Sequence, residues 1–287
     1  MKCGIVCLIG RPNAGKSTLL NAILKTKVAI TSPKPQTTRF AIEAVYEDER
    51  GQIIFVDTPG IFAKTPDTLS KKINPKAEDA MGKEVDAVLY IVDHTRERSF
   101  EENKALGVVR KATVPKILVI NKTDIKTPTH IVQYKFMEEE FDATVEVSAL
   151  TRSNLNILLD TIFDVLPEGK QIIDTTGMVQ PALNMDSKLF LSELIREKAF
   201  LNLRNEVPYS LTATVDEIDE RENGVLYIKG RLITNDDKYK GFIVGHRGKM
   251  IKEIGMAVKK ELETASRKKV YIDLTVDCDP HWMEYLQ

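Results

Sequence analysis

The stretch Gly10-Arg11-Pro12-Asn13-Ala14-Gly15-Lys16-Ser17 fits the pattern GxxxxGK[ST], and Thr18 follows it. It comes after the apolar run IVCLIG and opens a helical pattern, which is the strand–loop–helix context of a phosphate-binding loop. In such a loop, backbone N–H groups surround the phosphates and the helix start adds its positive end. Lys16 would then reach the β and γ phosphates, and Ser17 would bind Mg²⁺. The alternative is an ordinary glycine-rich turn before a helix.

Short apolar runs alternate with helical patterns from Cys3 to about Leu166. We expect helices that begin at Lys16 and Asn154 and further helices near residues 100–111 and 130–140. The expected strands, in chain order, are IVCLIG, AIEAVY, QIIFVD, AVLYIVD, KILVIN and ATVEVS. Nearly continuous apolar strands between helices are typical of a mostly parallel sheet with helices on both faces. Residues 1–167 are therefore predicted to form an α/β domain that binds its ligand at the carboxyl ends of the strands.

Three further motifs lie at the ends of these strands. Asp57-Thr58-Pro59-Gly60 follows IIFV, so that Asp57 can hold Mg²⁺ through water and the N–H of Gly60 can face the γ-phosphate. Asn121-Lys122-Thr123-Asp124 closes the strand KILVI, where the Asp124 carboxylate can accept two N–H bonds from guanine. Adenine lacks that donor pair, so we expect selectivity for guanine. Ser148-Ala149-Leu150 follows the next strand and can present a backbone N–H to guanine O6.

These motifs, together with QTTR at residues 36–39, resemble those of the TrmE-Era-Septin class of small GTPases. The resemblance covers residues 1 to about 166 and implies a P-loop GTPase domain with GTP and GDP as ligands. It also implies that a threonine after the first helix closes onto Mg²⁺ and the γ-phosphate. We expect this to be Thr38, with Thr37 as the alternative, so that Ser17, Thr38 and Asp57 hold the metal.

Ile61 bears on the mechanism of hydrolysis. Ras-like enzymes place a water-orienting glutamine directly after the DxxG glycine, but the alkyl side chain of Ile61 cannot hydrogen-bond water. The resemblance implies a substitute, because in potassium-activated relatives the residue at the position of Asn13 helps to hold K⁺ against the phosphates. The alternative is that Asn13 only caps the loop backbone. The expected catalytic set is Asn13, Lys16, Thr38 and Gly60.

The pattern changes after Leu166-Pro167-Glu168-Gly169, which ends the last helix of the first domain. Residues 168–185 contain turn formers without a sustained period and are predicted to be a linker. Beyond them we expect, in order, a helix over 187–204, strands over 211–218 and 225–233, a helix after Gly248 and a strand over 270–276. This order predicts a separate α+β domain over residues 186–287.

Gly245-His246-Arg247-Gly248 fits GXXG, the loop by which KH domains clamp the backbone of four nucleotides. Residues 238–270 around it hold ten Lys and Arg against three Glu, a local net charge of +7. The alternative for this basic run is a solvated helix face with i,i+4 ion pairs. We expect Trp282 to pack on the domain rather than to stack on bases. The predicted RNA-binding set is Gly245, His246, Arg247, Gly248, Lys249 and Lys252.

A GTPase of this class followed by a type II KH-like domain resembles the Era family of bacterial GTPases, and ELIREKAFLNLRNEVPYS at residues 193–210 is similar to the family's pattern. The resemblance implies a GTP-hydrolysing switch that binds 16S-type ribosomal RNA and acts in assembly of the small, 30S ribosomal subunit. The resemblance also implies that residues 239–245, YKGFIVG, form a short helix, although the propensities of these residues favour a strand. The rival function is a constitutive RNA-binding module whose GTP site is structural.

Composition is ordinary for a globular protein and selects no partner by itself. The chain has 287 residues, enough for about two domains, and its 41 Lys and Arg against 42 Asp and Glu give a net charge of −1. Its 3 cysteines form no disulfide framework or zinc cluster, and no apolar run reaches the roughly 20 residues of a membrane span. We therefore expect a cytoplasmic protein, and we expect it to be a monomer. The family resemblance alone implies peripheral association with the inner face of the cell membrane.

Overall fold

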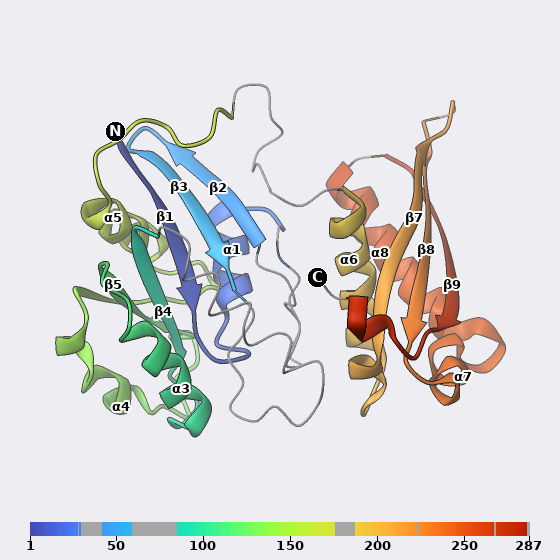
Figure 1. Cartoon of the computed structure of the whole chain (residues 1–287), viewed down its shortest axis with the longest axis horizontal. Helices are drawn as coiled ribbons and strands as arrows, with labels where there is room; N and C mark the ends of the chain where they lie inside the picture. The colour runs from blue at the N-terminus through green and yellow to red at the C-terminus, as the bar shows by residue number, and fades with distance from the viewer. Residues whose placement is uncertain are drawn as a thin grey trace. The chain divides into compact units, whose positions relative to one another are not determined.

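Two units make up the chain, Met1–Asn184 and Met185–Gln287, each with its own sheet (Figure 1). The computed structural model describes residues 1–27, 29, 42–58, 85–175, 187–222, 224–266 and 268–285. The division falls within the stretch that the sequence predicts to be a linker.

The first unit is built on a six-stranded sheet in the order β2-β3-β1-β4-β5-β6. Its strands are β1 (Lys2–Ile9), β2 (Ile42–Asp48), β3 (Gly51–Asp57), β4 (Ala87–Asp93), β5 (Lys116–Asn121) and β6 (Ala143–Glu146). All neighbouring strands are parallel except the edge pair β2 and β3. The predicted mostly parallel sheet is therefore confirmed, and the ends of β1, β3, β4 and β5 that carry the motifs share one edge.

Both faces of this sheet are buried, because its central strands are continuous apolar runs. Every residue of β4 is buried, and Val88, Tyr90 and Val92 belong to a core that includes residues of α3 (Phe100–Val109). Leu89 and Ile91 alternate with them and point to the opposite face. Two further helices of the described residues, α1 (Lys16–Leu24) and α5 (Leu155–Val165), contact β3 and β6 respectively.

One helix is shorter than the sequence predicts. The helix expected near residues 130–140 is α4 (Ile131–Lys135), and a 3₁₀ turn, Glu138–Glu140, follows it. Ile131 and Val132 are β-branched, and His130 provides no side-chain cap for the first turn. Both features weaken a helix, which accounts for the difference.

The described part of the predicted linker is attached to the sheet of the first unit. The buried side chain of Gln52 in β3 donates to the carbonyl oxygen of Ile173 (2.8 Å) and accepts the N–H groups of Ile172 and Ile173, each at 2.9 Å. The hydroxyl of Thr175 donates to Glu47 of β2 at 2.7 Å. The next residues of the predicted linker, from 176 on, lie outside the described residues.

The second unit is a three-stranded sheet packed against helices. Its elements are α6 (Ser187–Asn202), β7 (Leu211–Glu220), β8 (Leu226–Thr234), α7 (Lys240–Val244), α8 (Lys249–Ser266) and β9 (Val270–Cys278). Strands β7 and β8 are antiparallel, β8 and β9 are parallel, and inward residues of all three pack against α6 and α8. The predicted α+β domain is confirmed, and α7 is the short helix that the family resemblance implies.

Trp282 is part of the packing of the second unit. Its indole is buried and donates to the carbonyl oxygen of Ser210 at 3.1 Å, as expected for a residue that packs on the domain. None of the helices that the structure describes is both long enough and apolar enough to cross a membrane.

Candidate functional site

The phosphate loop lies between β1 and α1, and its two glycines have no room for a side chain. A Cβ on Gly10 would lie 2.3 Å from the carbonyl oxygen of Ile91, and one on Gly15 would lie 2.3 Å from Asn121 Nδ2. Gly15 also has a φ of +99°, in the left-handed region that favours glycine. The loop therefore packs closely against β4 and against the first residue of NKTD.

Lys16, Ser17 and Asp57 lie together beside the loop. The Ser17 hydroxyl donates to Asp57 Oδ2 at 2.6 Å, and the Lys16 ammonium donates to the carbonyl oxygens of Gly10 (3.1 Å) and Arg11 (3.3 Å). Burial lowers the pKa of Lys16, and burial raises the pKa of Asp57 to about 6 against the attraction of Lys16. Both charges are therefore poorly solvated, and a bound cation and a bound anion would stabilise them.

Asp57 and Ser17 form a donor set that fits Mg²⁺. Asp57 is fully buried, and its Oδ1 makes no hydrogen bond to any described residue. Mg²⁺ prefers oxygen ligands, and it usually binds one or two protein groups while phosphates and waters complete its shell. The unpaired carboxylate oxygen and the adjacent hydroxyl supply such ligands.

Hydrogen bonds join the NKTD motif to the phosphate loop and to the turn at residues 148–150. Asn121 Nδ2 donates to the carbonyl oxygen of Ala14 (3.0 Å), and its Oδ1 accepts the N–H of Ala149 (3.0 Å). The Ser148 hydroxyl donates to Asp124 Oδ1 at 2.5 Å. The structure thus brings the phosphate loop, the end of β5 and the turn at residues 148–150 to one place, with the Ala149 N–H already engaged by Asn121.

One member of a charged pair at this edge of the sheet, Asp93, is absent from the predicted site residues, whereas its partner Lys122 is among them. Lys122 Nζ lies 2.7 Å from Asp93 Oδ2, at the end of β4. Burial raises the pKa of Asp93, but hydrogen bonds from Lys122 and Thr95 outweigh it, so that the pKa is lowered overall. Asp93 ends an apolar strand, as Asp57 and Asn121 do, and that position was the signal in the sequence.

The other predicted residues of the GTP site differ in their placement. The buried hydroxyl of Thr58 donates to the carbonyl oxygen of Leu8 at 2.7 Å and so joins β3 to β1. Asn13 has a left-handed backbone with φ +62°, and the side chain of Leu150 is exposed. Within the loop and the first turn of α1, Arg11, Pro12 and Ala14 are buried and Thr18 is half-buried. The residues that lie outside the described part of the chain are Thr37, Thr38, Pro59, Gly60 and Ile61.

In the second unit, the GHRG loop is a tight turn between α7 and α8. The N–H of Gly245 donates to Gly241 O (2.9 Å), and the N–H of Gly248 donates to Gly245 O (3.1 Å). Gly245, Gly248 and Arg247 all have positive φ, at +73°, +75° and +51°. A Cβ on Gly245 would lie 2.6 Å from Met250 Cβ, whereas no described atom lies within 4 Å of one on Gly248. The backbone at Gly248 is therefore open to a ligand.

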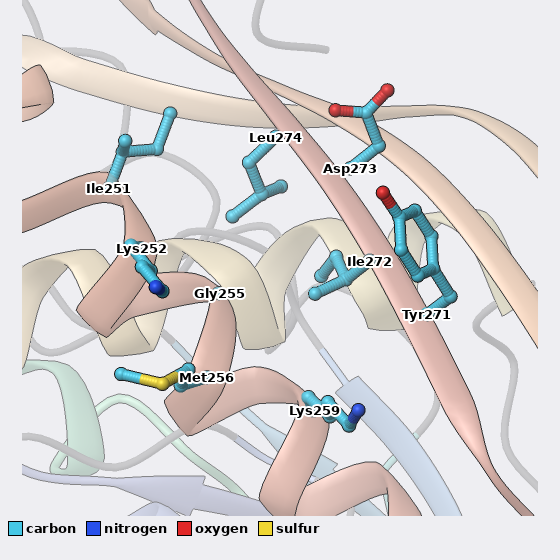
Figure 2. Close-up of a pocket in the computed structure, with 9 residues that line it drawn as sticks. All are labelled: Ile251, Lys252, Gly255, Met256, Lys259, Tyr271, Ile272, Asp273 and Leu274. Carbon is cyan, nitrogen blue, oxygen red and sulfur yellow. The ribbon is translucent and has the colours of Figure 1, made fainter. Parts of the chain in front are cut away.

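A groove of about 310 Å³ lies between α8 and the edge strand β9 (Figure 2). Figure 2 shows Ile272 and Leu274 on the helix side of β9. Opposite them is Gly255, where a Cβ would lie 3.6 Å from Ile272 and 3.7 Å from Leu274. Lys252 and Lys259 also line the groove. It therefore combines an apolar surface with two cationic side chains, next to the loop that opens α8.

Acidic partners neutralise part of the basic run at residues 238–270, as the solvated-face alternative predicts. The ion pairs are Lys238–Asp236 (2.8 Å), Lys240–Asp237 (3.1 Å), Lys249–Glu253 (3.9 Å), Lys259–Glu263 (3.7 Å) and Lys268–Glu220 (2.7 Å). Among the described residues of this run, Arg247, Lys252, Lys260 and Lys269 have no such partner, and all four are exposed, as is His246. Cationic groups without an acidic partner thus remain at the GHRG loop and in the first turn of α8, and also farther along the run at Lys260 and Lys269.

Known proteins resemble this chain over nearly its whole length. Residues 5–122 match the family described as 50S ribosome-binding GTPase, and residues 206–282 match the KH domain. GTPase Era of Halothermothrix orenii is 36% identical over 285 residues, which are 99% of this chain and 95% of that protein. GTPase Era of Deinococcus radiodurans is 38% identical over 289 residues, which are 98% of this chain and 91% of that protein.

Two solved structures have the same fold in both units. A crystal structure of an Aquifex aeolicus Era variant bound to GDP and AlF4⁻ matches with a TM-score of 0.90 and 35% identity, and covers 99% of this chain and 96% of its own. A crystal structure of Era in complex with MgGDPNP and nucleotides 1506–1542 of 16S ribosomal RNA matches with a TM-score of 0.89, at the same identity and coverage. The chain therefore belongs to the Era family of GTPases.

Proposed function

We propose that this member of the Era family hydrolyses GTP in its first unit, binds small-subunit ribosomal RNA through its second unit, and acts as a nucleotide-gated factor in 30S assembly. The observation that carries the proposal is the presence, on one chain, of the Lys16, Ser17 and Asp57 cluster and of a GXXG loop beside the α8–β9 groove. The Era structure that contains both MgGDPNP and a 16S ribosomal RNA fragment supports this pairing of ligands.

In the first unit, the residues would act by positioning and by charge. Phosphoryl transfer to water needs no protein nucleophile, and Mg²⁺ supplies positive charge to the phosphate oxygens when it is bound. Ser17 and Asp57 would hold that ion, and Thr38 would complete the set. Lys16 would neutralise the β and γ phosphates, while Asp124 would bind the N–H groups of guanine and fix the other end of the nucleotide.

We also propose K⁺ as an accessory cation that Asn13 helps to hold. Because Ile61 cannot orient water through a hydrogen bond, charge stabilisation next to the phosphates would have to come from another group. We expect faster hydrolysis in K⁺ than in Na⁺ at equal ionic strength, and we expect Asn13→Ala to abolish the difference. Equal rates in the two salts for the parent protein would leave Asn13 with the alternative role of capping the loop.

In the second unit, we propose that GHRG and the groove bind one single strand of RNA. Gly245, His246, Arg247 and Gly248 would clamp the sugar–phosphate backbone, and Lys249 and Lys252 would add charge along α8. Bases turned toward the protein would meet the apolar surface of Ile272 and Leu274. The flat face of any base can pack on such a surface, whatever the RNA sequence. The groove would therefore raise the affinity for RNA more than it would select a particular sequence.

The test of this function is GTP turnover by the parent protein with and without an RNA that corresponds to nucleotides 1506–1542 of 16S ribosomal RNA. A switch predicts turnover that the RNA changes, and Lys16→Ala serves as the control without turnover. A constitutive RNA-binding module predicts negligible turnover and equal RNA affinity with GDP and GDPNP, and that result would refute the proposal.

We propose that the protein is a monomer and that it is located in the cytoplasm. We also propose that it associates peripherally with the inner face of the cell membrane. The family resemblance is the basis for the membrane part. Light scattering measures the oligomeric state, and flotation with vesicles of anionic lipid tests the association. A protein that stays at the bottom of the gradient in both nucleotide states would exclude this part of the proposal.

A further inference from the structure

A buried network of charged side chains lies directly behind the phosphate loop. The mechanism proposed above gives this network no role. The side chain of Arg11 is 1% exposed and that of Glu102, in the first turn of α3, is 0% exposed. Arg11 Nε lies 2.9 Å from Glu102 Oε2 as an ion pair. The hydroxyl of Tyr90 donates to the other carboxylate oxygen at 2.6 Å. A fully buried ion pair is costly to desolvate, so its presence here calls for a role beyond stability.

The guanidinium of Arg11 joins the phosphate loop to the loop at residues 93–97, which connects β4 to α3. Its two terminal nitrogens donate to the carbonyl oxygens of Glu97 (3.0 Å), Asp93 (3.2 Å) and Arg96 (3.4 Å). Arg96 links the same two loops from the opposite side, because its guanidinium donates to the carbonyl oxygen of Pro12 at 3.4 Å. The two loops are thus held together from both sides.

The loop at residues 93–97 also reaches the guanine-reading motif. Asp93 forms the ion pair with Lys122, and His94 Nε2 lies 3.0 Å from the carbonyl oxygen of Lys122. Lys122 has a left-handed backbone, with φ +68°, so its conformation depends on contacts that hold it. One short loop therefore contacts both ends of the nucleotide site, the phosphate loop through Arg11 and the base loop through Lys122.

We propose that Arg11 is a positioning residue for GTP, and that the Arg11–Glu102 pair sets the phosphate loop at a fixed distance from the guanine-reading loop through residues 93–97. The inference rests on the proposed function, because it concerns the same nucleotide site. A nucleotide that is bound at both ends is sensitive to this distance, since a misplacement of about 1 Å can cost about a hundredfold in rate.

The experiment removes the pair without leaving a buried charge. In the double variant Arg11→Met with Glu102→Leu, the hydroxyls of Tyr90 and Tyr134 keep backbone acceptors, Glu102 O (3.2 Å) and Arg96 O (2.9 Å). Arg11→Lys is the second variant. It keeps a positive charge beside Glu102, but one ammonium cannot reach Glu102 and the three carbonyl oxygens together. The matched control is Arg110→Met with Glu140→Leu, an exposed ion pair at 2.7 Å that joins the C-terminal end of α3 to the 3₁₀ turn Glu138–Glu140.

The readout is titration with fluorescent GDP, which gives the number of binding sites and their Kd separately, followed by kcat for GTP. A positioning role predicts a Kd at least tenfold weaker and a kcat about a hundredfold lower per binding site in the double variant, a smaller loss in Arg11→Lys, and no change in the control. A merely structural role predicts fewer sites with the Kd and kcat of the parent.

Parent values of Kd and kcat per site in both variants would overturn the inference. Should the double variant fail to fold, Arg11→Lys decides alone by the same two quantities. The parent protein in this experiment tests the proposed function independently, because a parent that neither binds GDP nor hydrolyses GTP would refute that function and not only the role of Arg11.

Discussion

Asp57 and Lys16 carry charges in a site that excludes water, and each charge has a cost while no nucleotide is bound. Burial raises the pKa of Asp57 to about 6, which means that the folded chain disfavours its ionised form relative to the unfolded chain. The cost is complete above the pKa of the folded state and disappears below 3.8, the ordinary pKa of an aspartate. A residue that serves ion binding therefore lowers the stability of the empty domain.

Asp57→Asn is predicted to raise the free energy of unfolding of the nucleotide-free protein by about 1 to 3 kcal/mol at pH 7.5, because a rise in pKa from 3.8 to about 6 corresponds to at most about 3 kcal/mol. The same substitution should abolish Mg²⁺-dependent hydrolysis. Urea unfolding without Mg²⁺ and nucleotide measures the first effect, and the parent should approach the stability of the variant as the pH falls from 6 to 4. Lower stability of the variant at pH 7.5 would contradict this account of Asp57.

At this scale, the sequence predicts residues whose role depends on a local motif. Lys16, Ser17 and Asp57 were found because each stands at a defined offset from a strand end, and the structure brings them together. Glu102 could not be found in this way, since an acidic residue in the first turn of a helix is also typical of an exposed position. Its partner Arg11 is 91 residues away, and only the fold brings the two together.

At the level of the structural elements, substitutions in the turn between α7 and α8 should separate RNA binding from GTP binding most clearly. His246→Asp with Arg247→Asp is predicted to abolish RNA binding and to leave GTP affinity and the melting temperature near those of the parent. The reason is that carboxylates are tolerated at a helix N-terminus but repel phosphate. Filter binding at fixed salt measures the RNA affinity.

The matched control for this variant is Arg204→Asp with Asn205→Asp. It changes the net charge equally, it lies in the same unit, and Asn205 has a left-handed backbone (φ +54°) as Arg247 does (φ +51°). The control should retain most of the RNA affinity. Parent-like affinity of the His246 and Arg247 variant would mean that the GHRG loop is a structural turn only.

Gly255 of α8 allows the groove itself to be tested. A Cβ there makes ordinary contacts of 3.6 and 3.7 Å with β9, so Gly255→Ala should raise the unfolding free energy by about 0.5 to 1 kcal/mol through helix propensity. The methyl group also narrows the groove, so RNA affinity should fall although the protein is more stable. Unchanged affinity in the same filter assay would place the bases elsewhere.

The elements themselves were predictable to different degrees. The apolar strands β4 and β5 lie at the residues that the sequence predicts. A strand that is buried on both faces needs an unbroken run of apolar residues, and such a run is easy to locate in the sequence. The sequence predicts a longer helix than α4. The β-branched residues at its start, Ile131 and Val132, favour extended structure and limit the helix to Ile131–Lys135. The stretch that forms α7 has strand propensity and was assigned correctly only through the family resemblance, because packing on the second unit's core overrides local preference.

For the whole molecule, the two ligand sites lie in different units of one chain that is close to neutral overall. Because the net charge is −1, the long-range attraction of the whole protein to RNA is weak. The position of the individual cationic side chains must therefore determine where RNA binds. The exposed cationic groups without an acidic partner at GHRG would then determine where RNA binds, and nucleotide in the first unit would determine when. Such gating requires a free energy of coupling between the sites, which is about 1 to 3 kcal/mol in typical allosteric proteins.

The most direct test of this gating is the Kd of a labelled RNA that corresponds to nucleotides 1506–1542 of 16S ribosomal RNA, measured with MgGDPNP and with MgGDP at the same salt concentration. A coupling of this size predicts RNA binding about 5- to 150-fold tighter with MgGDPNP, the nucleotide present in the RNA complex of the Era relative. The same Kd with MgGDPNP, with MgGDP and without nucleotide would contradict a nucleotide-gated role.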